Sequence, residues 1–164
     1  MKPILVQKYG GSSVANVERL KNVAKRVVRA AKAGNAVAVV TSAQGDTTDE
    51  LVQKAYEILP DPKIAKREYD ALIATGEKIS IALLAMALIA EGWDAVSYTG
   101  SQAGILTDSQ YTKARILDID TRLIRYDLAE GRIVVVAGFQ GVDRGGRTTT
   151  LGRGGSDITA AALA

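Results

Sequence analysis

Short runs of aliphatic and β-branched residues alternate with longer segments of helical periodicity along this chain. The first long segment, residues 17–31, keeps apolar residues on one face and most basic residues elsewhere, which predicts an amphipathic helix capped by Asn16 or a neighbour. Because a strand, a helix and a strand follow one another between residues 4 and 40, the pattern predicts an α/β fold with a parallel sheet. Four apolar runs predict its buried strands, at residues 4–9, 36–40, 95–98 and 133–137.

The middle of the chain predicts three further helices. The first runs from about residue 48 to 59 and the second from about 63 to 74, with Pro60-Asp61-Pro62 between them. Thr75-Gly76-Glu77 is expected to interrupt the pattern before the third helix, at 78–91. This third helix is apolar on nearly every side, so it is either a central core helix or a dimer face, and we favour the core.

The last part of the chain predicts smaller elements around the fourth strand. Residues 105–118 indicate a two-stranded excursion, and residues 121–130 indicate a helix. Gly145-Gly146 is typical of a hairpin turn, after which the chain leads into a glycine-rich stretch at 151–157.

Polar, glycine-rich loops follow the carboxyl ends of the predicted strands. In a parallel α/β sheet these ends share one edge, and ligands bind in the crevice outside it. We therefore expect the loops to converge on one site. They span residues 8–13, 41–48, 99–104 and 138–157.

The stretch 151–157, which reads LGRGGSD, predicts an anion site. Its glycines allow close backbone approach, and good helix formers follow, so the amides of Gly155, Ser156 and Asp157 are expected to point outward from a helix N-terminus. Arg153 adds a planar fork that suits a carboxylate or a phosphate. The alternative is a glycine-rich turn in which Ser156 is simply the helix N-cap.

Composition limits the chemistry that is available. The 164 residues are 47% hydrophobic and 24% charged, which fits one soluble globular domain, and the net charge of +3 is too scattered to indicate a nucleic-acid binder. There is no cysteine and no histidine, which excludes disulfides, a structural zinc site and a Ser-His-Asp arrangement. The chemistry must use lysine, arginine, carboxylates, hydroxyls and backbone amides.

Targeting and membrane signals are not expected. The N-terminus becomes polar and glycine-rich too soon for a signal peptide. The longest apolar run, residues 79–89, is shorter than the roughly 20 residues that span a bilayer. The chain is therefore expected to be cytoplasmic.

Lys8 stands beside Gly10-Gly11 at the end of the first predicted strand. This is not a Walker A loop, in which the lysine follows the glycines, and residues 152–155 do not form a GxGxxG dinucleotide motif. A lysine next to bare amides nevertheless provides what a transferring phosphoryl group requires. The alternative is an ordinary exposed lysine at a strand end.

Six stretches of the chain, taken in order, closely resemble aspartate kinase of the amino acid kinase superfamily. The resemblance covers essentially the whole chain, and the combination is far more specific than any single stretch. Gln44 departs from the family, which usually has methionine or another residue there. The stretches are residues 7–15, 42–51, 75–77, 99–105, 138–142 and 149–157, which read QKYGGSSVA, SAQGDTTDEL, TGE, TGSQAGI, GFQGV and TTLGRGGSD.

The resemblance implies a three-layer α/β/α sandwich with a mainly parallel sheet. It also implies transfer of the ATP γ-phosphoryl group to the β-carboxylate of L-aspartate, giving 4-phospho-L-aspartate, in the biosynthesis of lysine, threonine and methionine. A carboxylate nucleophile is already ionised at neutral pH, so the absence of histidine is no obstacle, and catalysis reduces to positioning and charge neutralisation.

Site roles are carried over from the family position by position. Lys8 would neutralise the transferring phosphoryl group and Asp157 would orient Lys8. Gly10, Gly11 and Ser12 would hold phosphate oxygens of ATP, which arrives as its Mg2+ complex, and no residue of this chain is expected to bind a metal itself.

The same comparison assigns the amino-acid substrate. Arg153 would hold the α-carboxylate of L-aspartate and Glu77 its ammonium group, with Ser42, Thr48 and Ser156 as hydrogen-bonding partners. Without the family match, Glu77 would be interpreted as an acid at a helix N-terminus.

Full-length members of the family continue beyond the part that this chain matches. Residues 1–164 would form the N-terminal, amino-acid-binding part, and the nucleotide-binding half and the regulatory ACT domains would be absent. We therefore expect the chain to be inactive on its own, and to be part of a homo-oligomer only in the full-length protein. The alternatives are a sister kinase acting on glutamate, acetylglutamate or a nucleotide, and a non-catalytic binding or assembly fragment whose apolar helix seeks a partner chain.

Overall fold

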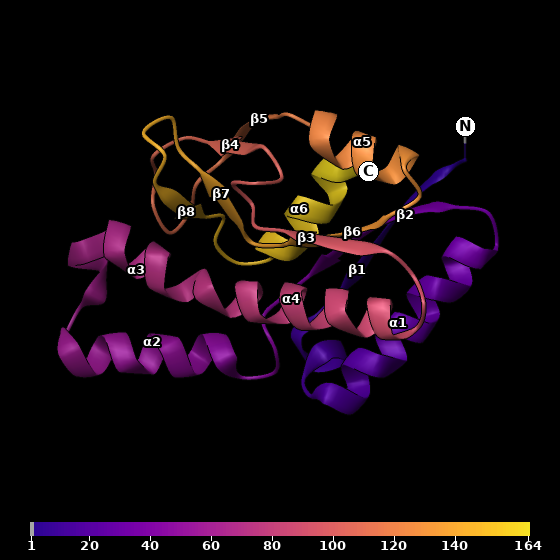
Figure 1. The fold of residues 1–164 in the computed structure, drawn as a ribbon. Helices are drawn as coiled ribbons and strands as arrows, with labels where there is room; N and C mark the ends of the chain where they lie inside the picture. The colour runs from indigo at the N-terminus through magenta and orange to yellow at the C-terminus, as the bar shows by residue number, and fades with distance from the viewer. Residues whose placement is uncertain (1) are drawn as a thin grey trace.

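Four parallel strands form the central sheet of the computed structural model, which describes residues 2–164 (Figure 1). The strands are β1 (Ile4–Tyr9), β2 (Ala36–Thr41), β6 (Ile133–Ala137) and β3 (Ala95–Tyr98), in that spatial order. Tyr9 pairs with Thr41 and Thr41 with Ala137, so the carboxyl ends of three strands lie side by side. The predicted parallel sheet is confirmed, and its carboxyl edge is where the loops meet.

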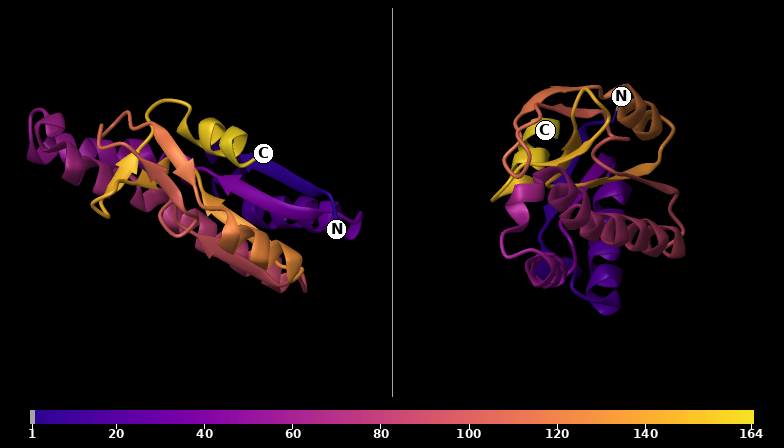
Figure 2. Two further views of the ribbon diagram at one scale, coloured as in Figure 1. Left: turned by 90° about the horizontal axis from the view of Figure 1, so that it is seen from above. Right: turned by 90° about the vertical axis from the view of Figure 1, so that its left-hand side faces the viewer.

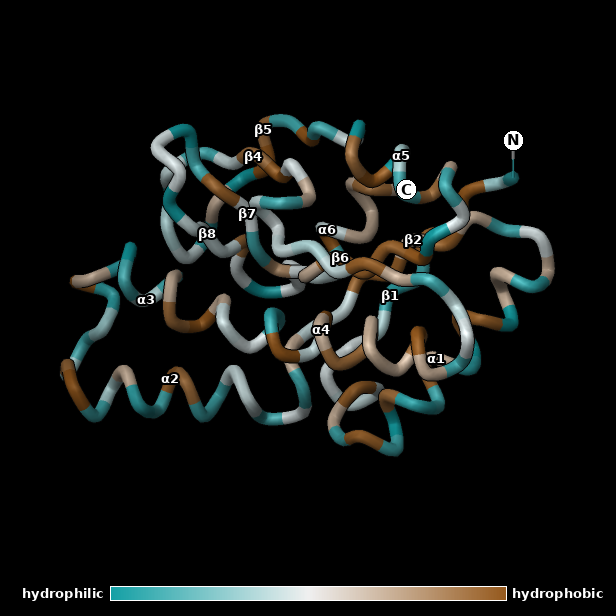
Figure 3. The backbone as a smooth tube through the Cα atoms, viewed as in Figure 1, coloured by the Kyte–Doolittle hydropathy of each residue, from teal (hydrophilic) through white to brown (hydrophobic). Residues whose placement is uncertain are grey.

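Helices cover both faces of this sheet and complete the predicted three layers (Figures 1 and 2). Helices α1 (Val17–Lys32) and α4 (Thr75–Ala90) pack on one face, and α5 (Arg122–Ala129) and α6 (Gly155–Leu163) on the other. Alternate residues of β6 serve the two layers, because Ile133 and Val135 join the α1 and α4 core while Val134 and Val136 join the opposite one. The buried, aliphatic strands β2 and β6 have the brown colour of hydrophobic residues in Figure 3.

Helix α1 follows the sequence prediction closely. The side chain of Asn16 accepts a hydrogen bond of 2.9 Å from the Arg19 amide and so caps the helix. Its buried residues recur at helical spacing and face the sheet. They are Leu20, Val23, Ala24, Val27, Val28 and Ala31.

A second, smaller sheet lies beside the carboxyl edge of the first. It contains β5 (Ile116–Ile119), β4 (Ile105–Thr107), β7 (Gln140–Val142) and β8 (Thr148–Thr150), in that order. The sequence indicated a two-stranded excursion and a hairpin, and the structure joins them through parallel pairing of β4 with β7. Local patterns could not show that pairing.

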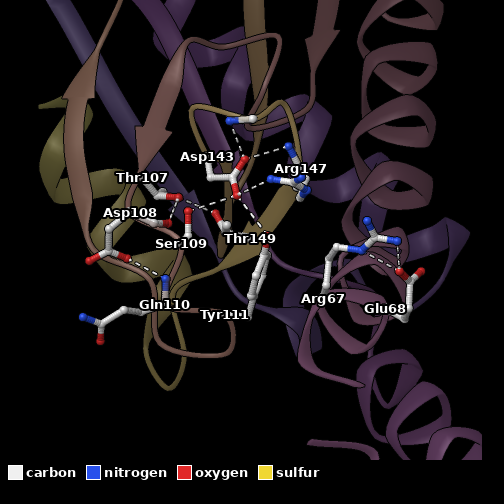
Figure 4. A network of polar contacts seen from close by, with 11 residues as sticks. Arg67, Glu68, Thr107, Asp108, Ser109, Gln110, Tyr111, Asp143, Arg147 and Thr149 are labelled. Atoms are coloured by element: carbon white, nitrogen blue, oxygen red, sulfur yellow. Dashed lines mark hydrogen bonds and ion pairs between the residues drawn. The ribbon is translucent and has the colours of Figure 1, made fainter. Parts of the chain in front are cut away.

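The buried carboxylate of Asp143 holds the turn between β7 and β8 (Figure 4). It accepts hydrogen bonds from the amides of Gly145 and Arg147, both 2.9 Å, and from the hydroxyls of Ser109 at 3.1 Å and Tyr111 at 3.0 Å. These donors, led by the Arg147 amide, hold the pKa of Asp143 below its ordinary value. The carboxylate thereby joins the hairpin to the loop that follows β4.

The predicted break at residues 75–77 is wrong. After α2 (Thr47–Ile58), the short 3-10 helix η2 (Pro62–Ala65) and α3 (Lys66–Ile73), helix α4 already begins at Thr75. Gly76 lies in its first turn, where an added Cβ would come within 2.8 Å of the Ala43 side chain. This glycine therefore permits close packing against the loop after β2 and does not end a helix.

Helix α4 is a core helix with one exposed apolar side. Its buried residues, among them Leu84 and Leu88, face α1 and the sheet, whereas Ile79 and Met86 are exposed. The stretch Pro62–Ala90 is also long and apolar enough to cross a membrane by length and composition alone. This length arises because α3 and α4 follow each other with only Ala74 between them, and half of the apolar window is buried inside the fold.

Candidate active site

A cavity of about 310 Å³ opens at the carboxyl edge of the parallel sheet. This volume is within the roughly 300–1,000 Å³ that is usual for small-molecule sites. Its walls come from the loops after β1 and β2, the start of α4, the end of β6 and the start of α6. The lining residues are Lys8, Gly11, Ser42, Ala43, Gly45, Thr48, Glu77, Phe139, Gly152, Gly154, Gly155, Ser156 and Asp157.

Lys8 and Asp157 form an ion pair at the cavity wall. The Lys8 Nζ lies 3.0 Å from the Asp157 Oδ1, although the two residues come from β1 and from the first turn of α6. The lysine side chain is 31% exposed and the aspartate 72% exposed, so water screens the pair and its contribution to stability is small. Asp157 limits where the Lys8 ammonium can stand, and the ammonium remains accessible to a ligand.

Close packing between glycines and side chains sets the position of the α6 N-terminus. A Cβ on Gly155 would lie 2.7 Å from the Phe139 ring, and one on Gly138 would lie 2.6 Å from the Ser156 Oγ. The first turn of α6 therefore sits directly against the end of β6. Its leading amides and the positive end of the helix dipole consequently border the cavity, which suits an anion.

Ser156 is not the helix N-cap. That position is taken by Gly154, in the left-handed conformation at φ 70°, and no side chain caps the helix. The Ser156 Oγ instead accepts a hydrogen bond of 2.9 Å from the Ser42 Oγ, which joins the loop after β2 to α6. The Ser42 carbonyl accepts a second one, of 2.7 Å, from the Ser80 hydroxyl of α4. Three elements that are distant in sequence are thus fixed together at the cavity wall.

Glu77 is a buried carboxylate at the cavity with one oxygen unpaired. Its Oε1 accepts a hydrogen bond of 3.3 Å from the Ala43 amide, while its Oε2 is buried without a partner among residues 2–164. Burial raises the pKa of Glu77 to about 7, against the smaller opposing effect of its hydrogen bonds. A buried acceptor of this kind needs a donor, and a ligand cation in the cavity would supply one.

Not every residue that the family resemblance assigned reaches the cavity. Arg153 is exposed between two lining glycines, and it makes no ion pair or side-chain hydrogen bond within residues 2–164. Gly10 and Ser12 do not line the cavity, and the Ser12 carbonyl accepts a hydrogen bond of 2.6 Å from Arg19. Lys8, Gly11, Ser42, Thr48, Glu77, Ser156 and Asp157 do line it.

The expectation that residues 99–104 join the site is wrong. Gly100 packs against the backbone of Gln140, where an added Cβ would come within 2.2 Å of the carbonyl oxygen. This loop therefore packs against the start of β7, and none of its residues lines the cavity.

Phe139 is a lining residue that the sequence did not single out. It has a left-handed backbone, φ 73°, which is rare for an aromatic residue. Both of its backbone polar groups are hydrogen-bonded in this conformation: its amide donates to the Thr159 hydroxyl at 3.1 Å, and its carbonyl accepts from the Leu151 amide at 2.9 Å. Its position directly after Gly138, which follows a buried strand, was the available signal.

The donors and the carboxylate at the cavity fit a ligand that carries both an anionic and a cationic group. Residues 2–164 contain no group of three or more acidic side chains that could hold a metal ion. The cavity offers the Lys8 ammonium and the α6 amides for negative groups, and Glu77 for a positive group.

Comparisons with known proteins find similarity over nearly the whole chain. A model of the amino acid kinase family matches residues 3–164. An aspartokinase of Bacillus sp. (strain MGA3) is 58% identical over 161 residues, which is 98% of this chain. This chain spans 39% of the length of that relative.

Solved structures of aspartate kinases also superpose on nearly the whole chain. An aspartate kinase from Synechocystis superposes with a TM-score of 0.82 and 44% identity, over 98% of this chain and 26% of its own. E. coli aspartokinase III, solved in complex with aspartate and ADP, has a TM-score of 0.81 and 26% identity, over 99% of this chain and 46% of its own.

Proposed function

Because the chain belongs to the amino acid kinase family, we propose that its cavity binds L-aspartate as the phosphoryl acceptor of an ATP-dependent aspartate kinase. The proposal is supported by sequence identity to aspartokinases and by the aspartate and ADP that the E. coli structure contains. Residues 1–164 would be the amino-acid-binding part, and most nucleotide contacts would lie outside them. The complete enzyme would act in the cytoplasm.

The observation that carries this proposal is the unpaired Oε2 of Glu77. A buried carboxylate beside a cavity requires a positive partner, and the ammonium group of an amino acid provides a charge and three donors. The same cavity offers the α6 amides to the carboxylates of such a ligand, and the Lys8 ammonium is left for the phosphoryl group. A ligand with one ammonium and two carboxylates can pair with Glu77 through its ammonium and with the α6 amides through a carboxylate.

The chain's own residues would contribute positioning and charge. Lys8 would approach the oxygens of the transferring phosphoryl group and neutralise the charge that develops on them, held in place by Asp157. The Ser42 and Ser156 hydroxyls, 2.9 Å apart, would orient the substrate between β2 and α6. The β-carboxylate of aspartate attacks in its ionised form, so no residue has to remove a proton.

The cavity has groups within residues 2–164 that suit the phosphates of ATP but none that suit a metal ion. Lys8, Gly11 and the α6 amides fit phosphate oxygens, whereas no group of acidic residues within residues 2–164 fits a metal ion. Mg2+ would therefore arrive bound to ATP. Gly10 and Ser12 would contact phosphate only if their loop moved toward the cavity.

A chimera tests the activity directly. Residues 3–164 would replace the matching residues of the Bacillus sp. (strain MGA3) aspartokinase, whose remainder supplies the rest of the enzyme. We expect ATP-dependent formation of aspartyl hydroxamate when hydroxylamine traps the acyl phosphate, and at most about 1% of that rate with L-glutamate, because the longer chain misplaces the acceptor carboxylate. A folded chimera that phosphorylates L-glutamate as well as L-aspartate would contradict the assignment, and the unmodified Bacillus enzyme is the control.

A further inference from the structure

A fully buried carboxylate outside the cavity connects two of its walls. Asp70 lies in α3 and has no exposed surface. Its Oδ2 accepts hydrogen bonds from the amides of Thr150, at 2.8 Å, and Thr112, at 2.9 Å. Its Oδ1 accepts one from the Thr150 hydroxyl at 2.8 Å and shares the Thr112 amide at 3.1 Å.

Both donors belong to segments that border the turn carrying Arg153. Thr150 ends β8 three residues before Arg153. Thr112 has a left-handed backbone, φ 72°, and its carbonyl oxygen would lie 3.0 Å from a Cβ on Gly152. The Ala114 amide also donates to the Thr150 carbonyl at 2.9 Å. Asp70 thus fixes the strand that leads into the turn and the segment that packs against it.

The helix that carries Asp70 leads directly to Glu77. The Ala74 amide donates to the Asp70 carbonyl at 3.1 Å, and the Ala74 carbonyl accepts from the Gln140 side chain at 2.8 Å. Helix α4 begins at the next residue, and Glu77 lies in its first turn. Asp70 therefore connects the helix pair that places Glu77 with the turn that places Arg153.

We propose that Asp70 is a positioning residue, which sets the distance between the carboxylate-binding and ammonium-binding sides of the cavity by fixing the Gly152–Gly155 turn to α3. This inference rests on the proposed function for the roles of Arg153 and Glu77. Burying a carboxylate costs free energy, and apolar residues could join α3 to β8 more favourably. An apolar residue could not accept hydrogen bonds from the Thr112 and Thr150 amides, whereas the Asp70 carboxylate accepts both and so fixes their positions. Thr112 is also the residue with the left-handed backbone.

Amide hydrogen exchange on the 164-residue chain tests the positioning without any ligand. Asp70→Asn keeps the side-chain volume but replaces the charged carboxylate with a neutral amide, which has one acceptor oxygen for the donors of Thr150 and Thr112. Exchange at Leu151 and Gly155 should accelerate in this variant by at least about tenfold. These amides donate to Phe139 and Gly152, at 2.9 Å and 3.1 Å. The Gly138 amide, which donates to Thr41 at 3.0 Å, should keep its rate.

Two further variants separate positioning from a general loss of stability. Thr150→Val removes only one of the hydrogen bonds to Asp70 and should accelerate the same two amides to a smaller extent. Asp127→Asn alters a buried carboxylate of α5 that contacts Tyr98 and Arg132 instead, and it should leave Leu151 and Gly155 unchanged. Equal acceleration at Gly138 and Gly155 in Asp70→Asn and Thr150→Val would overturn the proposal.

Aspartate binding supplies a coupled readout. Asp70→Asn should raise the Kd for L-aspartate by about tenfold when Arg153 is present, and by less than about twofold in an Arg153→Ala background. The reason is that Asp70 acts on binding through the position of the Arg153 guanidinium, which the second background lacks. The same factor in both backgrounds would show a merely structural role and overturn the proposal. If the unchanged chain binds no L-aspartate, the proposed function fails, and the exchange rates alone decide whether Asp70 positions the turn.

Discussion

Replacing Arg153 with alanine should weaken L-aspartate binding by on the order of 100-fold, since a charge-assisted, two-pronged contact to a carboxylate contributes about 1.5–3 kcal/mol. Arg153 stands exposed between Gly152 and Gly154, which both line the cavity, so its long side chain begins at the edge of the cavity. The measurement is calorimetric titration of the 164-residue chain with L-aspartate.

Two controls make this result specific. Arg153→Lys keeps the charge but loses the planar fork, and should lose about tenfold in affinity. Arg144→Ala removes an exposed arginine from the turn between β7 and β8, away from the cavity, and should bind as the unchanged chain does. Unchanged affinity in Arg153→Ala would remove this residue from the site.

Replacing Lys8 with alanine should lower phosphoryl transfer by on the order of 1,000-fold in the chimera, while the Kd for L-aspartate changes by less than about threefold. Lys8 is the one lysine that lines the cavity within residues 2–164, and its Nζ is only partly exposed, next to Asp157. Its charge matters most when negative charge moves onto the transferring group, so the loss should fall on kcat.

The matched control for this change is Lys25→Ala. Lys25 is an exposed lysine of α1 that does not line the cavity, and its removal should leave the rate of aspartyl hydroxamate formation within about twofold. A Lys8→Ala chimera that retains its kcat but loses affinity for L-aspartate would reverse the assignment, because Lys8 would then hold the acceptor.

The parts of the site that follow from the sequence are those that depend on local pattern. β1 and β6 end at the predicted residues and β2 ends one residue later than predicted, which places Lys8, Ser42 and Gly138 at one edge. The glycines of 152–155 indicated a helix N-terminus, and α6 begins at Gly155. In each case the signal lies within a few residues of the feature.

Features that depend on distant contacts could not be predicted. Asp70 looks like any surface acid of an amphipathic helix, yet its partner Thr150 is 80 residues away and the contact buries it completely. The pairing of β4 with β7 and the close approach of Gly76 to Ala43 are of the same kind. Glu77 was named from the family resemblance, and its burial and unpaired oxygen became visible only in the structure.

The most direct test of the account is calorimetric titration of the 164-residue chain with L-aspartate, succinate and β-alanine at pH 8 and pH 6. Succinate lacks the ammonium group that Glu77 would hold, and β-alanine lacks the α-carboxylate assigned to Arg153, so each should bind at least about tenfold more weakly than L-aspartate at pH 8. Because the pKa of Glu77 is about 7 and its ionised form is the one that binds an ammonium, affinity for L-aspartate should be close to its full value at pH 8 and about tenfold lower at pH 6. The affinity of succinate should not fall in this way. A cavity that binds all three ligands equally, or binds L-aspartate with the same affinity at both pH values, would contradict the account.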